Sequence, residues 1–223
     1  MKSFLGKAIG VAIAALLSLT GCGDGGDGQS TSTSETATAE TDQTLPYAVA
    51  PKDFTPVMAY TTTLSVVPGQ SASFHVSDHA GSTTSARSVA ASIVRVGAAE
   101  TVMATATLSG LKRAIPANAW VDCCNWPRSW SVRINASWRS GLYRARFQIA
   151  GNETSTYFVV RNPTPGSISK TVLQVPLYTP VAYNNFGGKS VYDYISTNNQ
   201  RAPQVSVYRP NEDLANSVYN WVE

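Results

Sequence analysis

Gly141-Leu142-Tyr143-Arg144-Ala145-Arg146-Phe147-Gln148-Ile149 is the clearest structural pattern in the sequence. Apolar and polar side chains alternate along it, so the apolar ones share one face of an extended chain. That apolar face is formed by Tyr143, Ala145, Phe147 and Ile149. Strict alternation indicates a β-strand that is buried on one side. The stretch therefore predicts a strand that faces a hydrophobic core.

Further short runs on both sides have the same β-rich composition and end at turn residues. They are residues 61–67, 71–77, 91–96, 101–108, 130–134 and 157–161. Seven short strands, without a long helical period between them, favour an antiparallel β-sandwich of immunoglobulin-like or jelly-roll type. The sequence thus predicts a mainly β protein with a sandwich domain at 46–162, closed by Pro163-Thr164-Pro165-Gly166.

The pattern changes after residue 166. Residues 171–175 are a compact apolar run typical of buried parallel strands, and residues 204–208 form a second such run. Residues 190–195 fit a helical turn. Residues 211–222 carry a capping Asn and apolar residues at helical spacing, which favours a helix. We therefore expect residues 167–223 to be the incomplete start of an α/β domain.

The N-terminus has the features of an export signal. A basic head and an apolar stretch precede Leu19-Thr20-Gly21-Cys22, which resembles the bacterial lipobox. On that resemblance residues 1–21 are a lipoprotein signal peptide and Cys22 carries the lipid; the alternative is an ordinary signal peptide whose cysteine is incidental. Residues 22–45 lack large apolar side chains and predict a flexible linker. We expect a lipid-anchored, extracytoplasmic protein of the bacterial cell envelope.

Charge argues against one class of partner. Removing Lys2 and Lys7 with the signal peptide leaves 15 basic residues against 14 acidic ones. A nearly neutral chain lacks the positive footprint of a nucleic-acid-binding protein. We expect the membrane, through Cys22, as a partner and no nucleic acid.

Several other residues have more than one interpretation. Cys123 and Cys124 are adjacent, which disfavours a structural disulfide and leaves small loop side chains, a strained vicinal disulfide or a soft-metal site. His75 and His79 fit surface or turn positions. The tryptophans crowd one stretch, where they pack a core or line a sugar platform. They are Trp120, Trp126, Trp130 and Trp138.

The chain resembles the large (β) subunit of N,N-dimethylformamidase and its wider family. The resemblance rests on motifs that occur in the same order over about residues 57–223. They are Leu64-Ser65-Val66-Val67-Pro68-Gly69, Val121-Asp122-Cys123-Cys124-Asn125-Trp126-Pro127, Trp138-Arg139-Ser140-Gly141-Leu142-Tyr143-Arg144-Ala145, Tyr157-Phe158-Val159-Val160-Arg161, Leu173-Gln174-Val175-Pro176, Ala182-Tyr183-Asn184-Asn185-Phe186-Gly187-Gly188-Lys189-Ser190-Val191-Tyr192 and Val205-Ser206-Val207-Tyr208-Arg209-Pro210.

The resemblance implies hydrolysis of a small amide at an iron ion held by two tyrosines and one glutamate. Hard phenolate and carboxylate oxygens suit such an ion, which would activate water and polarise the amide carbonyl. By position in the motifs the tyrosines are Tyr143 and Tyr183, while Glu212 and Glu223 stand in other contexts. The third ligand is therefore not found in this chain, which alone is not expected to hold iron. The resemblance also implies a small partner subunit or a homo-oligomer.

Two functions follow from these patterns. The first is an inactive or incomplete lipoprotein relative of this iron-dependent amide hydrolase. The alternative is a non-catalytic surface β-sandwich that binds a polysaccharide or a protein partner.

Overall fold

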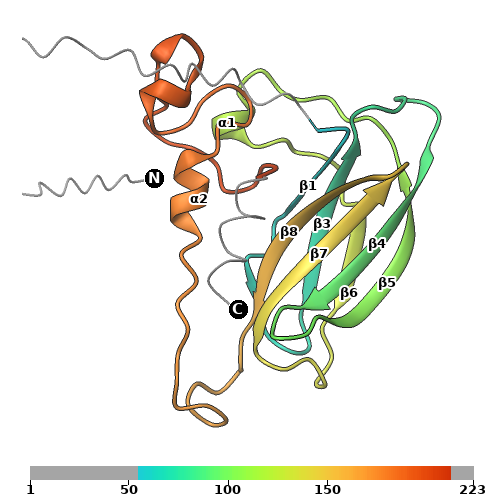
Figure 1. Ribbon diagram of the computed structural model, residues 1–223, viewed down its shortest axis with the longest axis vertical. Helices are drawn as coiled ribbons and strands as arrows, with labels where there is room; N and C mark the ends of the chain where they lie inside the picture. Colours follow the sequence, from blue (N-terminus) through green and yellow to red (C-terminus); the bar gives the residue numbers. More distant parts are fainter. Residues whose placement is uncertain (1–54, 212–223) are drawn as a thin grey trace, which may run out of the picture. The chain divides into compact units, whose positions relative to one another are not determined.

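Residues 55–211 are described by a computed structural model. Eight strands dominate it: β1 (Val57–Thr61), β2 (Ser65–Val66), β3 (Ser71–Asp78), β4 (Arg87–Arg95), β5 (Thr101–Gly110), β6 (Trp130–Arg133), β7 (Gly141–Ile149) and β8 (Asn152–Val160). The helices are short: α1 (Ala119–Asp122), α2 (Tyr178–Tyr183) and the 3-10 turns η1 (Asp193–Ile195) and η2 (Thr197–Asn199). The expected mainly β fold is confirmed (Figure 1).

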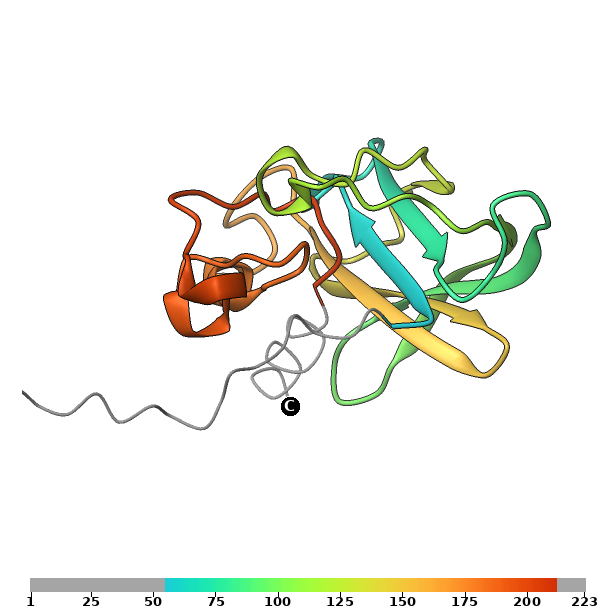
Figure 2. The same ribbon diagram turned by 90° about the horizontal axis from the view of Figure 1, so that it is seen from above.

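The strands form two sheets that face each other. One has the order β1-β3-β6, and the other has the order β2-β8-β7-β4-β5. All pairs are antiparallel except β2 with β8, which is parallel. Figure 2 shows the two layers from above, with residues 167–211 beside them. The predicted antiparallel sandwich is therefore correct, and its larger sheet is mixed at one edge.

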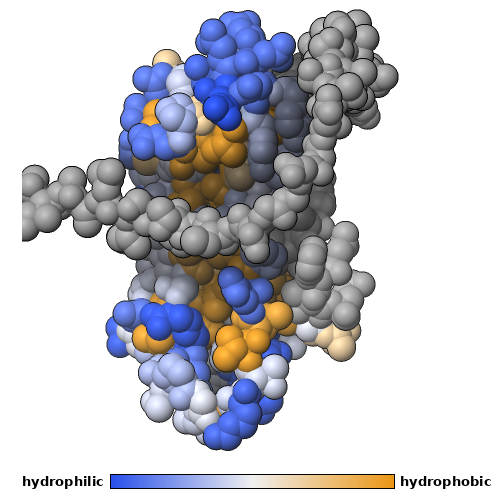
Figure 3. Space-filling model, turned by 90° about the vertical axis from the view of Figure 1, so that its left-hand side faces the viewer, coloured by the Kyte–Doolittle hydropathy of each residue, from blue (hydrophilic) through white to orange (hydrophobic). Residues whose placement is uncertain are grey.

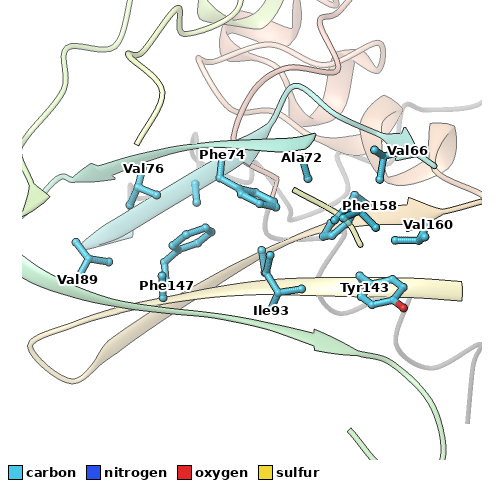
Figure 4. Packing of buried hydrophobic residues seen from close by; sticks show 14 of the residues in the cluster. Val66, Ala72, Phe74, Val76, Val89, Ile93, Tyr143, Phe147, Phe158 and Val160 are labelled. Atoms are coloured by element: carbon cyan, nitrogen blue, oxygen red, sulfur yellow. The ribbon is translucent and has the colours of Figure 1, made fainter. Parts of the chain in front are cut away.

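The core lies between the sheets and is centred on Phe74 of β3. The Phe74 ring centroid is 5.9 Å from that of Phe147 in β7 and 5.6 Å from that of Phe158 in β8. All three side chains are fully buried, together with Ile93 and Tyr143 (Figure 4). The alternation in β7 thus faces the core as predicted. On the outer face Arg144 and Arg146 form ion pairs with Glu100.

The run 61–67 is not the single strand that the sequence predicted. The hydroxyl of Thr61 accepts a hydrogen bond from the Thr63 amide at 2.9 Å, and such a local bond ends a strand. The chain then passes from the first sheet to the second, where Ser65–Val66 pairs with Val159 and Val160 of β8. Only Thr61, the first residue of this run, belongs to β1, which the sequence did not predict, and the rest of the run supplies β2 alone.

The two strands expected after residue 166 are not formed. Residues 171–174 are exposed and have no regular secondary structure, and neither do residues 204–208. In the second run the Ser206 amide donates to the Trp120 carbonyl at 2.7 Å instead of to a neighbouring strand. The predicted helical turn is present in part, as η1. The division into domains stays a prediction.

Several predictions lie outside the described residues. These are the signal peptide 1–21, the lipid attachment at Cys22, the linker 22–45 and most of the helix 211–222. Within residues 55–211, the helices are all too short to cross a membrane.

Candidate functional site

The guanidinium of Arg209 is buried, at 2% exposed. Its Nη1 donates to the carbonyls of Phe186 at 2.7 Å and Lys189 at 3.0 Å. Its Nη2 donates to Asn184 at 2.7 Å and Val181 at 3.4 Å, and its Nε donates to Ser206 at 3.1 Å. One side chain thereby fixes the backbone of residues 181–189, which we call the tyrosine loop because Tyr183 lies in it.

Burial lowers the pKa of Arg209 to about 10. A buried cation is costly unless its donors are satisfied, and here five backbone carbonyls satisfy them. The side chains of the loop add further bonds. Asn184 donates to the Pro210 carbonyl at 2.9 Å, and Asn185 donates to the Ile195 carbonyl at 3.1 Å. Side-chain hydrogen bonds therefore hold the loop after α2 ends at Tyr183, where residues 184–189 have no regular secondary structure.

Tyr183 stands at the end of α2 and is 42% exposed. Its ring centroid lies 4.5 Å from that of Tyr192, which lies 5.8 Å from that of Tyr194. Repulsion between the phenolates of Tyr183 and Tyr192 raises the pKa of Tyr192, and a hydrogen bond between them adds to the shift. Burial raises the pKa of Tyr194, with a smaller effect from its hydrogen bond to Tyr183. Tyr183 thus interacts with the phenol groups of both Tyr192 and Tyr194.

Tyr143 is in a different environment. It is fully buried in β7 between Trp138, at 5.1 Å between ring centroids, and Phe158, at 5.6 Å. Its hydroxyl donates to the Arg139 carbonyl at 2.6 Å. Burial raises the pKa of Tyr143, which favours the neutral phenol. Tyr143 is therefore a core residue with a satisfied hydroxyl in this arrangement.

These surroundings bear on the iron site that the resemblance implies. A ligand tyrosine must offer its oxygen, as phenolate, to the ion. Tyr183 is accessible for that role, but Tyr143 uses its hydroxyl proton within the core. The arrangement does not fit an iron ion held by both residues, and we derive no reaction step through iron. Among residues 55–211 His, Cys, Asp and Glu side chains form no group of three that could hold a metal.

Cys123 and Cys124 are both free thiols. Cys123 has a φ of 57°, and its Sγ lies 3.0 Å from Oδ1 of Asn125. Cys124 is buried, and this burial is the main cause that raises its pKa to about 12. Such a thiol is protonated at neutral pH and is a poor nucleophile. The arrangement matches the interpretation of small loop side chains.

His75 lies half-buried on β3, whereas His79 follows the strand in a turn. The ring of His75 stacks on Tyr60 at 4.7 Å, and its Nδ1 lies 2.7 Å from the Trp126 carbonyl. The Trp126 amide in turn donates to the Tyr60 hydroxyl at 3.1 Å. Trp130 and Trp138 pack with the core between the sheets, and Trp126 packs in a second cluster with Tyr60, which favours core packing over a shared sugar platform.

A mainly apolar cavity of about 320 Å³ lies between β2, β8 and residues 173–181. Tyr157 and Val159 form one wall, Val175 and Val181 the other, and Arg209 is at its polar end. Figure 3 shows hydrophobic residues in the centre of this face.

Sequence reasoning identified Tyr183 as a candidate site residue but missed Arg209. The only sequence signal for Arg209 was its place in the motif 205–210.

Comparisons with known proteins give one specific match. The family model described as N,N-dimethylformamidase beta subunit-like, C-terminal, matches residues 90–223. No curated protein matches the chain.

Two solved structures are similar only weakly. One is the alkylpurine DNA glycosylase AlkC of Pseudomonas fluorescens bound to DNA with an abasic site analogue. It shares 14% identity at a TM-score of 0.29, over 49% of this chain and 32% of that one, so the match spans about a third of the glycosylase. The other is a chain in a structure on T cell activation by the bacterial superantigen toxic shock syndrome toxin-1. It shares 11% identity at a TM-score of 0.27, over 47% of this chain and 97% of that one. Neither score supports an argument about fold or function.

Proposed function

The chain belongs to the N,N-dimethylformamidase beta subunit-like family, and on that premise we propose that it is a lipid-anchored, extracytoplasmic member that does not hydrolyse amides by itself. Family membership supports a relation to amide hydrolysis. Function nevertheless depends on the site and not on the fold. The proposal therefore rests on what the two candidate ligand residues contact.

One observation carries the proposal. The Tyr143 hydroxyl donates a hydrogen bond to the Arg139 carbonyl, while Tyr183 lies in an exposed cluster of tyrosines. Tyr143 is fully buried, and its hydroxyl would have to lose its hydrogen bond to the Arg139 carbonyl before its oxygen could bind an ion as phenolate. This chain is thus expected to keep the tyrosine loop in place without assembling a hydrolytic centre.

The test is metal content and activity of the full chain. We expect that ferric iron, added and then removed from solution by desalting, leaves less than stoichiometric metal and no visible charge-transfer band from tyrosinate. We also expect no release of amine from dimethylformamide, with an active dimethylformamidase assayed in parallel. Stoichiometric iron with a band that Tyr143→Phe and Tyr183→Phe each abolish would overturn the proposal.

The anchor has its own test. Cells fed a labelled fatty acid are expected to label the wild-type chain and not Cys22→Ser. Labelled wild type should partition into the detergent phase, and the variant should be recovered in the aqueous phase. Equal labelling of both chains would exclude Cys22 as the attachment site.

A second candidate function is a binding module for a polysaccharide or a protein partner. The apolar cavity and the exposed rings of Tyr178, Tyr183 and Tyr208 favour it, because aromatic side chains with one polar end are common at binding surfaces. Co-sedimentation of the full chain with insoluble cell-wall polysaccharide tests it. Binding that Tyr178→Ala weakens would support this function, and no binding would leave protein partners as the remaining candidates for the module.

A further inference from the structure

The cavity between β2, β8 and residues 173–181 has the size and the walls of a ligand site. Its volume is about 320 Å³, and apolar side chains line most of it, among them Val159, Val175, Leu177 and Val181. Small-molecule sites in proteins have volumes of about 300–1,000 Å³ and mostly apolar walls with a few polar groups. The cavity can therefore hold a small ligand that is mainly apolar.

The charge around the cavity has one sign. Arg161 and Arg209 line it, and no Asp or Glu does so among the described residues. The five N–H donors of Arg209 are all taken by backbone carbonyls, so Arg209 contributes positive charge but no donor for a ligand. A cleft with positive charge and apolar walls attracts an anion and disfavours a cation.

Arg161 is the residue that can bind such an anion directly. Its main-chain amide donates to the Val66 carbonyl at 2.8 Å, which fixes the backbone from which the side chain extends. The side chain is exposed, and its guanidinium forms no hydrogen bond or ion pair with another residue of the range 55–211. A guanidinium presents its donors as a fork that matches the two oxygens of a carboxylate.

The positions of these groups limit the shape of the ligand. Side chains two residues apart on an extended chain share a face, so Tyr157, Val159 and Arg161 form a row that ends in a positive charge. At about 30 Å³ for each water-sized group, the cavity holds about ten non-hydrogen atoms. An unbranched aliphatic chain of about eight to ten carbons with one terminal carboxylate fits this arrangement.

We propose that the cavity is a binding site for a medium-chain fatty acid. The carboxylate pairs with Arg161, and the aliphatic chain lies against Val159, Val175 and Val181. The site uses neither Tyr183 nor a metal ion, so it is independent of the functions proposed above.

A competing occupant is the chain's own segment 212–223, which continues from Asn211 at the cavity. Its Leu214, Val218 and Trp221 recur at helical spacing and are apolar. These three side chains would cover the apolar walls but offer no anion to Arg161. A carboxylate with an aliphatic chain satisfies both parts of the cavity, which favours the fatty acid.

The experiment is isothermal titration calorimetry of the full chain with decanoate, with Cys22→Ser in every sample to exclude lipid attached to the protein. Decylammonium has the same chain length and a positive head group, so it is the matched control ligand. We expect one decanoate to bind per chain, and decylammonium to bind at least tenfold more weakly. No binding of decanoate, or equal binding of the two ligands, would overturn the proposal.

Two pairs of variants locate the ligand. Arg161→Gln should weaken decanoate binding at least tenfold, whereas Arg201→Gln, at a side chain that is 71% exposed and does not line the cavity, should keep the wild-type affinity. Val181→Phe fills part of the cavity and should abolish binding, whereas Val102→Phe on β5 should not. Circular dichroism checks that each variant is folded. Unchanged affinity in folded Arg161→Gln or Val181→Phe would place the ligand elsewhere and overturn the proposal.

Trp221→Ala, also in the full chain, tests the competing occupant. We expect this variant to bind decanoate as the wild type does. Binding that appears in Trp221→Ala and not in the wild type would mean that the segment 212–223 fills the cavity, which would overturn the fatty-acid site.

Discussion

The hydroxyl of Tyr143 stabilises the fold through one buried hydrogen bond. Tyr143→Phe removes the donor to Arg139 and keeps the stacked ring, so we expect it to lower the free energy of unfolding by about 1 kcal/mol. Urea unfolding followed by tryptophan fluorescence measures this. Tyr178→Phe, at a residue that is 79% exposed, is the control and should change it by less than about 0.5 kcal/mol. An unchanged stability in Tyr143→Phe would mean that the core bond contributes nothing.

Cys124 should make the fold sensitive to alkali. Its pKa rises from 9.0 to about 12 on folding, mainly because the thiol is buried. The folded state therefore keeps a proton that the unfolded chain loses, and this contribution to stability, complete below pH 9, is lost as the pH rises toward 12. Tyr60, raised from 10.0 to about 12, acts in the same direction.

Urea midpoints at pH 8, 9, 10 and 11 test this effect. We expect a decline in the wild type that is shallower in Cys124→Ala. Cys123→Ala keeps Cys124 but removes the repulsion that adds to its raised pKa, so its decline should lie between those of the wild type and Cys124→Ala. If the urea midpoint fell equally with pH in all three proteins, groups other than Cys124 would cause the loss of stability at high pH.

At the scale of elements, the tyrosine loop depends on Arg209. Arg209→Met leaves buried carbonyls of the loop without donors, so we expect the free energy of unfolding to fall by at least about 3 kcal/mol. Arg201→Met, whose side chain is 71% exposed, should cost less than about 0.5 kcal/mol. Thermal unfolding by calorimetry compares the two, and similar small losses would show that water replaces the guanidinium.

Local alternation predicted β3 and β7 closely, but β1 and the first half of β8 were missed although both pair with neighbouring strands. The bounds of β7 match the sequence pattern because its two faces differ in polarity along the whole strand. The first half of β8 was missed because Asn152–Thr156 is polar, although it pairs with β7. Residues 171–175 have the composition of a strand, but no strand of the described chain pairs with them.

The candidate site was predictable in part for a related reason. The motif around Tyr183 could be recognised from sequence, and its exposure beside Tyr192 agrees with a functional position. The five bonds of Arg209 could not be predicted, because they join carbonyls that become neighbours only after the loop has closed. The surroundings of Tyr143 are formed by Phe158 of the neighbouring strand and by Trp138 and Arg139 before β7, and the alternation within β7 does not specify these contacts.

At the scale of the whole molecule, Gly187 fixes how the tyrosine loop packs against α1. Its φ is +83°, and a Cβ there would lie 2.9 Å from the backbone nitrogen of Trp120. We expect Gly187→Ala to lower the free energy of unfolding by about 1–3 kcal/mol more than Gly166→Ala, which has a φ of +76° and open space around it. Because both glycines have a positive φ, urea unfolding of the two variants distinguishes the cost of the close contact with Trp120 from the cost of backbone strain. Equal losses of unfolding free energy would mean that the contact with Trp120 contributes nothing.

Arg209 lies near the end of the described chain, so it is synthesised after all the strands of the sandwich. The sandwich has all its strands once Val160 has been made, whereas the tyrosine loop needs a side chain roughly 50 residues later. At about 5–20 residues per second, that interval lasts roughly 2 to 10 seconds during synthesis. The order along the chain therefore makes every strand available before Arg209, and until residue 209 follows, the carbonyls of the tyrosine loop lack their guanidinium donor.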